Sequence, residues 1–267
     1  MIVPSFVEEH AAPYHFDHIE TFLGRVDVDG KRVLEIGSDY FLASARLIRA
    51  NGAAEVVSTN LTDWRSPDPL PEGIQFRVVD ASATGIADDS FDLIYGIAVL
   101  EHIPDMQRMC HEMRRLLRPG GKAFLEGCPF WSCSVGHHVR YAKQERVVYS
   151  FTDDTNPIAN WSHLVLSPTE MAEELESQGI CAEDAAGISQ FVYGMGETST
   201  QTPHSAGSPS NQLLPSEALS CLSRHFCLDI VKRYRDGAPE NEYYTRAKRE
   251  YGEGDLRTMG FSVVLET

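Results

Sequence analysis

The chain has 267 residues, of which 42% are hydrophobic and 23% charged, and its formal net charge is −16. This length and composition suffice for one main domain with a sizeable core. The acidity disfavours a large nucleic-acid partner, because most of the surface would repel a phosphate backbone.

The sequence shows no pattern typical of a signal peptide or of a membrane span. The first residues include Glu8 and Glu9 where a signal peptide needs an apolar run, and no apolar stretch approaches the ~20 residues of a membrane span. The six cysteines have no CxxC spacing and are interpreted as reduced thiols. We therefore expect a cytoplasmic protein without a membrane partner.

Helical and strand patterns alternate along the first half of the chain. Residues 14–25 place apolar side chains on one helical face, so an N-terminal helix is predicted, with His15 and His18 interpreted as solvated positions. The run RVLEI predicts a strand buried on both sides, and residues 41–50 predict a helix. Further strands are predicted over 54–59 and 74–80.

The next part of the chain repeats this alternation. FDLIY starts a fourth strand, and a helix with an apolar stripe runs from Met106 to Leu117, ended by Pro119 and Gly120. KAFLEG follows as a fifth strand. Strands separated by crossovers in this way predict a right-handed, doubly wound parallel sheet. A ligand crevice is expected at the carboxyl ends of its strands.

Residues 128–166 depart from this pattern, because they are irregular and rich in aromatic residues and histidine. Ser167 and Glu170 then have the spacing of a capping box, which predicts a helix ending near Gly179. The stretch 197–211 is rich in Ser, Thr and Pro and predicts a loop. Helices are expected near 214–225 and 240–251, and a strand at 261–266.

Five ordered motifs resemble the class I S-adenosylmethionine-dependent methyltransferases. They are VLEIGSD, STNLTDW, VVDAS, FDLIYGIAVLEHI and LRPGGKAFLE, and they extend over residues 30–127. The resemblance implies a Rossmann-like, seven-stranded, mostly parallel sheet in which the last strand in sequence inserts antiparallel near the edge. It also implies S-adenosylmethionine as cofactor and S-adenosylhomocysteine as product.

The first cofactor motif departs from the family pattern E-x-G-x-G-x-G. Glu35 and Gly37 match it, whereas Ser38, Asp39 and Phe41 stand where a small residue and two glycines usually occur. The glycines of the family let the backbone approach the cofactor. In this sequence Asp39 is a candidate to face the cofactor's ammonium group.

The remaining cofactor candidates follow later strands. Asn60 stands where the family has an acidic residue that binds the ribose hydroxyls, and an amide also hydrogen-bonds a diol. Asp80 matches the residue that accepts a hydrogen bond from the adenine amine. The cofactor-binding set that the resemblance implies is Glu35, Gly37, Ser38, Asp39, Asn60, Leu61, Asp80, Ala81, Gly96 and Ile97.

The acceptor side is implied by a weaker resemblance. FWSCSVGHHVRY and NWSHLVLSPTEM are similar to segments of a subgroup that methylates sugars or secondary metabolites. A hydroxyl acceptor gains from a base with a pKa near the operating pH, which suits histidine. The catalytic candidates are His137, His138, His163 and, in the LEH signature, His102, with Trp131, Tyr141 and Trp161 as stacking walls.

Other interpretations stay open at this point. Adjacent histidines also serve simply to hydrogen-bond a loop, or the trio beside Asp153 and Asp154 holds a divalent metal that activates the acceptor. A degenerate cofactor motif also fits a non-catalytic scaffold, or a protein that performs other chemistry on the cofactor. The predicted partner is a small molecule, and the sequence leaves the oligomeric state open.

These elements predict a single methyltransferase domain with four parts. Residues 1–29 form a helical cap, 30–127 the cofactor-binding core, 128–166 a lid over the acceptor, and 167–267 a C-terminal part that completes the sheet.

Overall fold

The computed structural model describes residues 1–143, 146–194 and 210–267. These residues form two compact units. The first comprises 1–127, 218–232 and 262–267, and the second comprises 128–217 and 233–261. The predicted boundary between core and lid at 127/128 thus coincides with a boundary between units, while the organisation as a single domain stays a prediction. Most of the predicted loop 197–211 lies outside the described residues.

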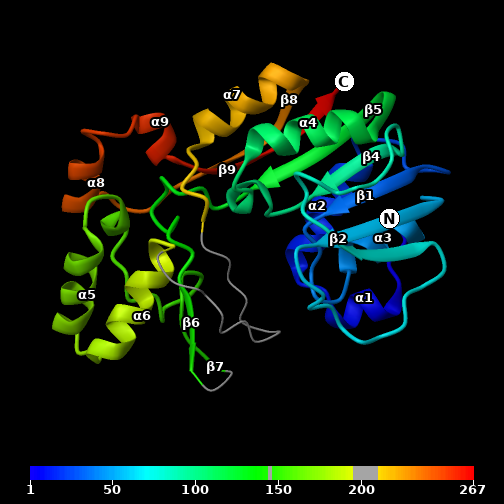
Figure 1. The fold of residues 1–267 in the computed structure, drawn as a ribbon. Coiled ribbons are helices and arrows are strands. Elements are labelled where there is room, and N and C mark those ends of the chain that lie inside the picture. The colour runs from blue at the N-terminus through cyan, green and yellow to red at the C-terminus, as the bar shows by residue number, and fades with distance from the viewer. Residues whose placement is uncertain (144–145, 195–209) are drawn as a thin grey trace. The chain divides into compact units, whose positions relative to one another are not determined.

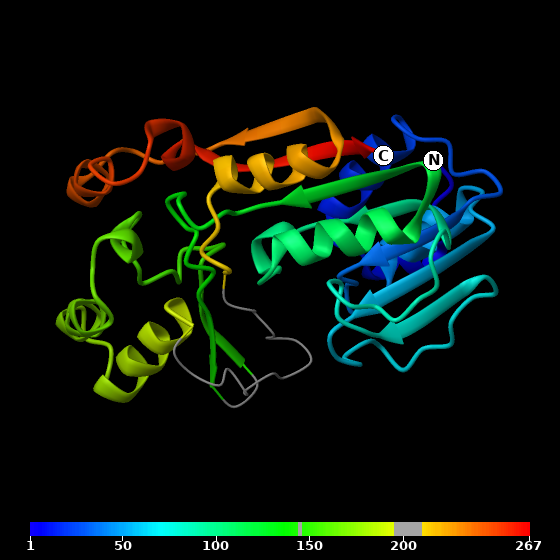
Figure 2. The same cartoon turned by 45° about the horizontal axis from the view of Figure 1, so that its top comes forward.

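A seven-stranded sheet organises the first unit (Figure 1). Its strands, in spatial order, are β3 (Ile74–Val78), β2 (Glu55–Asn60), β1 (Arg32–Ile36), β4 (Phe91–Gly96), β5 (Leu117–Gly127), β9 (Thr258–Glu266) and β8 (Cys227–Arg235). The first five are paired in parallel, with Val33 of β1 opposite Val56 of β2 and Leu93 of β4. Figures 1 and 2 draw the arrowhead of β9 opposite to that of β5. This arrangement confirms the predicted fold class, including the position of the last strand.

Helices cover both faces of this sheet (Figures 1 and 2). On one face lie α1 (Ser5–His10), α2 (Pro13–Leu23) and α3 (Ala43–Ala50), whose apolar side chains pack with those of β1, β2 and β4. On the other face lie α4 (Met106–Leu116) and α7 (Pro215–His225). A short 3₁₀ turn, η1 (Leu100–His102), follows β4.

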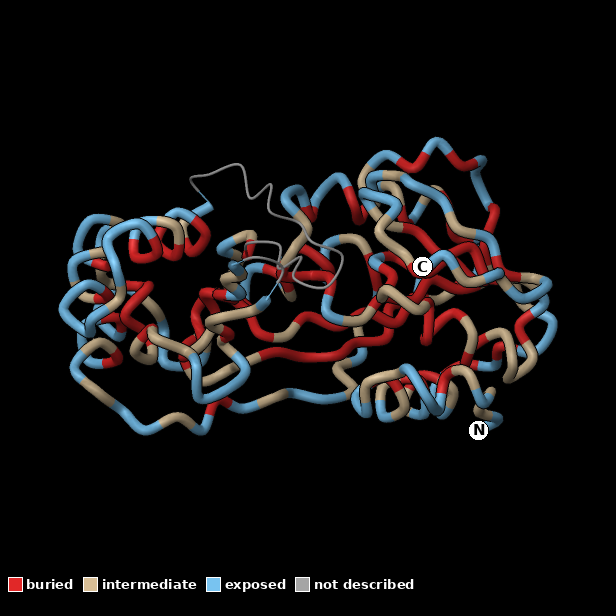
Figure 3. Tube along the Cα trace, turned by 90° about the horizontal axis from the view of Figure 1, so that it is seen from below, coloured by how far each residue is buried: buried red, intermediate tan, exposed pale blue. Residues whose placement is uncertain are grey.

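The second unit combines helices with a small hairpin. It contains β6 (Arg140–Lys143), paired antiparallel with β7 (Arg146–Ser150), the 3₁₀ turn η2 (Ser162–Leu164), and helices α5 (Pro168–Ser177), α6 (Ala182–Val192), α8 (Glu242–Ala247) and α9 (Glu253–Leu256). The capping box at Ser167 and Glu170 is present as predicted. A core around Trp161, Ile188 and Tyr244 holds this unit together. Figure 3 shows buried stretches in both units separated by exposed turns.

Several elements differ from the sequence expectation. The helix before the fifth strand ends at Leu116, and β5 begins at Leu117, because the chain has already turned extended before Pro119. Helices α1 and α6, the β6–β7 hairpin and β8 were not predicted. In β8 most side chains are exposed or half-buried, as at a sheet edge, so the sequence lacks the apolar run of a central strand. No helix among the described residues is long and apolar enough to cross a membrane.

One buried carboxyl group links two neighbouring parallel strands of the first unit, β1 and β2. The side chain of Glu35 on β1 is buried and accepts a hydrogen bond from the hydroxyl of Ser58 on β2, while Thr59 Oγ1 donates to the Glu35 carbonyl oxygen at 2.7 Å. Burial, together with the nearby charge of Asp39, raises the pKa of Glu35 to about 8. Glu35 is therefore a largely neutral group below that pH.

The substitution Glu35→Gln tests this assignment. Because the folded protein binds the Glu35 proton more tightly than the unfolded chain does, its contribution to stability is full at low pH and is lost as pH rises towards about 8. Denaturant unfolding measures this difference. Between pH 5 and pH 8, the free energy of unfolding of wild type should fall by about 3 to 4 kcal/mol more than that of E35Q. The exposed Glu72→Gln is the matched control, and equal pH profiles for wild type and E35Q would contradict the assignment.

Candidate functional site

The predicted cofactor residues gather at the carboxyl ends of neighbouring parallel strands. Gly37 follows β1, Asn60 ends β2, Asp80 lies just beyond β3, and Gly96 ends β4. Because β1 to β4 are parallel, these ends lie at one edge of the sheet. Gly37 and Asp80 are exposed, and Asn60 is half-buried. The edge is thus lined by polar and backbone groups within reach of solvent.

The turn after β1 is fixed by its backbone. The N–H groups of Gly37 and Ser38 both donate to the carbonyl oxygen of Thr59 at 3.1 Å. Gly37 has φ +74°, and a Cβ at this position would lie 3.1 Å from Val99 Cγ2. Glycine is therefore favoured here both by the backbone conformation and by the close approach of Val99 from the segment after β4.

Asp39 caps the helix that follows. Its Oδ1 accepts from the Phe41 N–H at 2.9 Å, and its Oδ2 accepts from the Ala43 N–H at 2.8 Å. This carboxylate thus binds backbone N–H groups at the start of α3, where a negative charge is favourable. The direct contact with a cofactor ammonium group stays a prediction.

Asn60 joins the ends of β1 and β2. Its Nδ2 donates to the Ser38 carbonyl oxygen at 3.0 Å, and its Oδ1 accepts from the Leu61 N–H at 2.8 Å. Its Nδ2 also donates to Ser38 Oγ at 3.4 Å, whereas its Oδ1 has a second lone pair that can accept from another donor. Asn60 therefore holds the β1 turn in place, whereas its contact with a ribose stays a prediction, as does that of the exposed Leu61.

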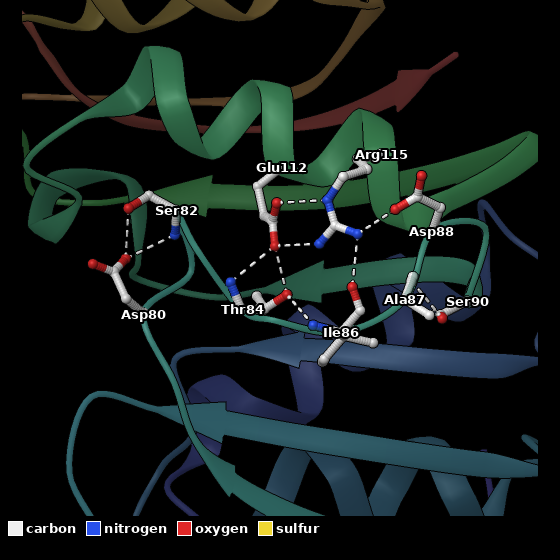
Figure 4. A network of polar contacts seen from close by, with 9 residues as sticks. All are labelled: Asp80, Ser82, Thr84, Ile86, Ala87, Asp88, Ser90, Glu112 and Arg115. Atoms are coloured by element: carbon white, nitrogen blue, oxygen red, sulfur yellow. Dashed lines mark hydrogen bonds and ion pairs between the residues drawn. The ribbon is translucent and has the colours of Figure 1, made fainter.

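Asp80 lies in a tight turn just after β3 (Figure 4). Its Oδ1 accepts from both the N–H and the hydroxyl of Ser82 at 2.7 Å, and these hydrogen bonds lower the pKa of Asp80. Figure 4 shows the second carboxylate oxygen pointing away from Ser82. The turn therefore keeps the carboxylate ionised and directs one oxygen elsewhere. Ala81, its neighbour in the motif, is half-buried.

The segment after β4 is also closely packed. A Cβ on Gly96 would lie 2.9 Å from Val99 Cγ1, so only glycine fits there without a shift. Ile97 is half-buried and Ala98 has φ +47°. The Val99 N–H donates to the Glu126 carbonyl oxygen at 3.1 Å, which ties this segment to the end of β5. His102 is half-buried at the end of η1.

Two histidines near this edge were misinterpreted from the sequence. His15 is 6% exposed and its Nδ1 lies 3.1 Å from Ser44 Oγ, while His18 Nδ1 lies 2.6 Å from Glu126 Oε2. The expectation that both are solvated is therefore wrong. Burial lowers the pKa of His15. A signal for His18 was Glu126, an acidic residue that follows the apolar run 123–125 of the fifth strand.

The histidine trio lies in the second unit and is buried there. His163 Nε2 donates to the Trp131 carbonyl oxygen at 2.8 Å, and His137 Nδ1 accepts from the Val139 N–H at 3.1 Å. The His137 and His163 ring centroids are 5.2 Å apart. His138 Nδ1 bonds the Gly136 carbonyl oxygen at 2.8 Å. The structure thus places His137 beside His163, whereas a role of the trio in the acceptor site stays a prediction.

Burial controls the protonation of this pair. It lowers the pKa of His163 to about 4 and that of His137 well below its usual value. Since a carbonyl oxygen only accepts, His163 carries its proton on Nε2, and its Nδ1 is an acceptor. Among the described residues, neither His163 Nδ1 nor His137 Nε2 has a hydrogen-bond partner. Both rings are neutral at physiological pH.

The predicted stacking residues are mostly part of the second unit's core. Trp161 is fully buried against Tyr244, and Trp131 is 5% exposed with its ring edge-to-face on His163 at 4.7 Å. Tyr141 is half-buried and donates its hydroxyl to Asp184 Oδ1 at 3.1 Å. This burial favours a packing role for the tryptophans, and acceptor contact stays a prediction.

The alternative metal site is not assembled. Asp153 and Asp154 are exposed, and Asp153 Oδ1 accepts from the Thr155 N–H at 3.0 Å. Within the described parts of the chain, no group of three ligating side chains combines either aspartate with the trio. The structure therefore gives this metal set no support.

Comparisons with known proteins agree with this architecture. The model of the methyltransferase domain family matches residues 37–125. The methyltransferase GfsG of Streptomyces halstedii is 36% identical over 111 residues, which make up 39% of this chain and 40% of that protein. The ubiquinone biosynthesis O-methyltransferase of Xanthomonas oryzae pv. oryzae (strain PXO99A) is 31% identical over 120 residues, or 42% of this chain and 48% of that protein. The chain thus matches less than half the length of these curated relatives.

Solved structures extend the likeness in fold over almost the whole chain. An S-adenosylmethionine-dependent methyltransferase from Mesorhizobium loti matches with a TM-score of 0.52 at 15% identity, covering 93% of this chain and 96% of that chain. A putative one from Listeria monocytogenes gives 0.51 at 12% identity, with 93% and 95% covered. At such identities the likeness shows the fold. Together, the strand order and these likenesses show the class I methyltransferase fold, and residues 37–125 match the methyltransferase domain family.

Proposed function

We propose that the protein is an enzyme that transfers the methyl group of S-adenosylmethionine to a hydroxyl of a small polar acceptor, a sugar or a secondary metabolite. The observation that carries this proposal is the row of Gly37, Asn60, Asp80 and Gly96 at the carboxyl ends of adjacent parallel strands. Both curated relatives are named as methyltransferases, and one is named an O-methyltransferase, which supports the reaction class.

The residues at this edge fit the cofactor chemically. A Cβ at Gly37 or Gly96 would meet Val99, so glycine at both positions lets the segment after β4 pack against the end of the sheet beside the proposed cofactor. Asp80 offers an ionised acceptor suited to the adenine amine, and Asn60 offers an amide suited to the ribose diol. When bound, the cofactor supplies an electrophilic methyl group on a sulfonium. The protein's residues then hold it and position the acceptor for in-line attack.

A histidine is proposed as the base. The imidazole would accept the proton of the acceptor hydroxyl when the bound cofactor gives up its methyl group to that oxygen. Among His102, His137, His138 and His163, the best-supported candidate is His163, because its Trp131 contact leaves Nδ1 as the proton acceptor. A buried acceptor without a partner is costly, and an acceptor hydroxyl would satisfy it.

The substitution Asp80→Asn tests the cofactor site. The amide that replaces the carboxylate would retain the Oδ1 acceptor for Ser82, but it would present an NH₂ group in place of the second carboxylate oxygen. Isothermal titration should therefore show S-adenosylhomocysteine binding weakened by about 1 to 3 kcal/mol. The exposed Asp17→Ala is the control and should bind as wild type does.

Two results would contradict this assignment in different ways. Wild-type affinity in D80N would remove Asp80 from the adenine site. A wild-type protein that does not bind S-adenosylhomocysteine at millimolar concentration would instead favour a non-catalytic scaffold with the same fold.

The substitution His163→Ala tests the base. Transfer of tritiated methyl from S-adenosylmethionine is measured with catechol and methyl glucoside as probe acceptors. H163A should lower turnover about 10²- to 10⁴-fold while the affinity for S-adenosylhomocysteine stays unchanged. The exposed His111→Ala should leave both unchanged.

The pH dependence provides a second test of His163. A base works in its neutral form, which dominates above its pKa, so wild-type turnover should stay level from pH 8 to pH 6 and fall as pH approaches about 4. Turnover that instead rises through neutrality would contradict His163 as the base. Full activity in single alanine variants of His137, His138 and His163 would remove the trio.

A further inference from the structure

One face of α4 lies along the connection between β3 and β4, which carries Asp80 (Figure 4). Glu112 Oε1 accepts from the Thr84 N–H at 2.8 Å and from the Thr84 hydroxyl at 2.5 Å. Thr84 Oγ1 in turn accepts from the Ile86 N–H at 3.2 Å. A single carboxylate oxygen therefore anchors the middle of this connection to the helix.

Arg115 holds that carboxylate in place. Its Nε and Nη2 donate to Glu112 Oε2 and Oε1 at 2.9 and 2.7 Å, a bidentate arrangement. Its Nη1 donates to the Ile86 carbonyl oxygen at 2.7 Å and to Asp88 Oδ1 at 2.5 Å. The hydrogen bonds from Arg115 and Thr84 lower the pKa of Glu112 to about 2, so the carboxylate is ionised at neutral pH. Glu112 and Arg115 together thus bind the β3–β4 connection at Thr84, Ile86 and Asp88.

Little chain separates this anchor from Asp80. The Ala83 N–H donates to the Asp80 carbonyl oxygen at 3.0 Å, and Ser82 binds the Asp80 side chain, so residues 80–83 form a closed turn. Thr84 follows immediately, and its side chain is buried between the connection and α4. One short hydrogen-bonded turn therefore connects Thr84 to Asp80, so the position of Thr84 restricts the position of the Asp80 carboxylate.

We propose that Glu112 is a positioning residue for the cofactor, because it fixes through Thr84 the turn that presents Asp80 and Ala81 to the adenosine part. This inference rests on the proposed function. Glu112 does not touch the ligand in this account. It acts by restricting the turn before binding, so that less conformational freedom is lost when the ligand binds.

The test uses the full chain with two substitutions, Glu112→Gln and Thr84→Val, both close in shape to the native side chains. E112Q removes the charge that Arg115 and Thr84 bind, and T84V removes one hydroxyl from the network. The exposed Glu20→Gln on α2 is the control. Affinities for S-adenosylhomocysteine and for 5′-methylthioadenosine are measured by isothermal titration, and hydrogen exchange is followed at the Thr84 and Ile86 amides.

E112Q should weaken both ligands by the same factor, about tenfold, because they share the adenosine part. T84V should weaken both by a smaller equal factor, and exchange at Thr84 and Ile86 should accelerate in both variants. If E112Q fails to fold, T84V carries the test. Wild-type affinities in the folded variants, or weakening confined to S-adenosylhomocysteine, would overturn the inference. Wild-type protein that binds neither ligand would show instead that the proposed function fails, and this result would overturn the inference as well.

Discussion

Parallel strands cannot be joined by tight turns, so the chain must cross back after each strand before it pairs with the next. In this protein that constraint applies four times, from β1 to β5. Every loop that leaves a carboxyl end therefore emerges at the same edge of the sheet. Gly37, Asn60, Asp80 and Gly96 meet there although they are far apart in the sequence. The candidate cofactor site follows directly from the topology.

The loops at that edge are held by side chains that hydrogen-bond backbone. Asp39 binds the start of α3, Asn60 binds the Ser38 carbonyl oxygen, and Glu112 binds Thr84. In the family pattern glycines shape the first of these loops by close approach alone. Here Asp39 and Asn60 hold a loop that keeps only Gly37 of the motif's glycines. The departures from the motif at these two positions therefore have a structural explanation, because both side chains hydrogen-bond the backbone of the loop.

The strands of the parallel part of the sheet could be predicted from the sequence because apolar runs are local signals, whereas the seven-stranded sheet with its inserted last strand was implied by the family resemblance. The role of Asp39 could not be predicted, because an aspartate after a strand suits both a ligand contact and hydrogen bonds to the start of a helix. His15 and His18 were misread because the periodicity of α2 does not reveal Ser44 and Glu126, which are distant in sequence and cover them. The second unit was the hardest part to predict. The burial of His137 depends on residues distant in sequence such as His163, and β6 and β7 have few buried side chains that would mark them as strands.

The position of bound S-adenosylhomocysteine is the most direct test of the proposed cofactor site, and a crystal structure of the complex would show it. We expect the adenine amine within hydrogen-bonding distance of the Asp80 oxygen that does not bind Ser82, the ribose beside Asn60, and the homocysteine part against the backbone at Gly37. A complex in which the ligand lies elsewhere, or in which Asp80 contacts only Ser82, would contradict the proposed site.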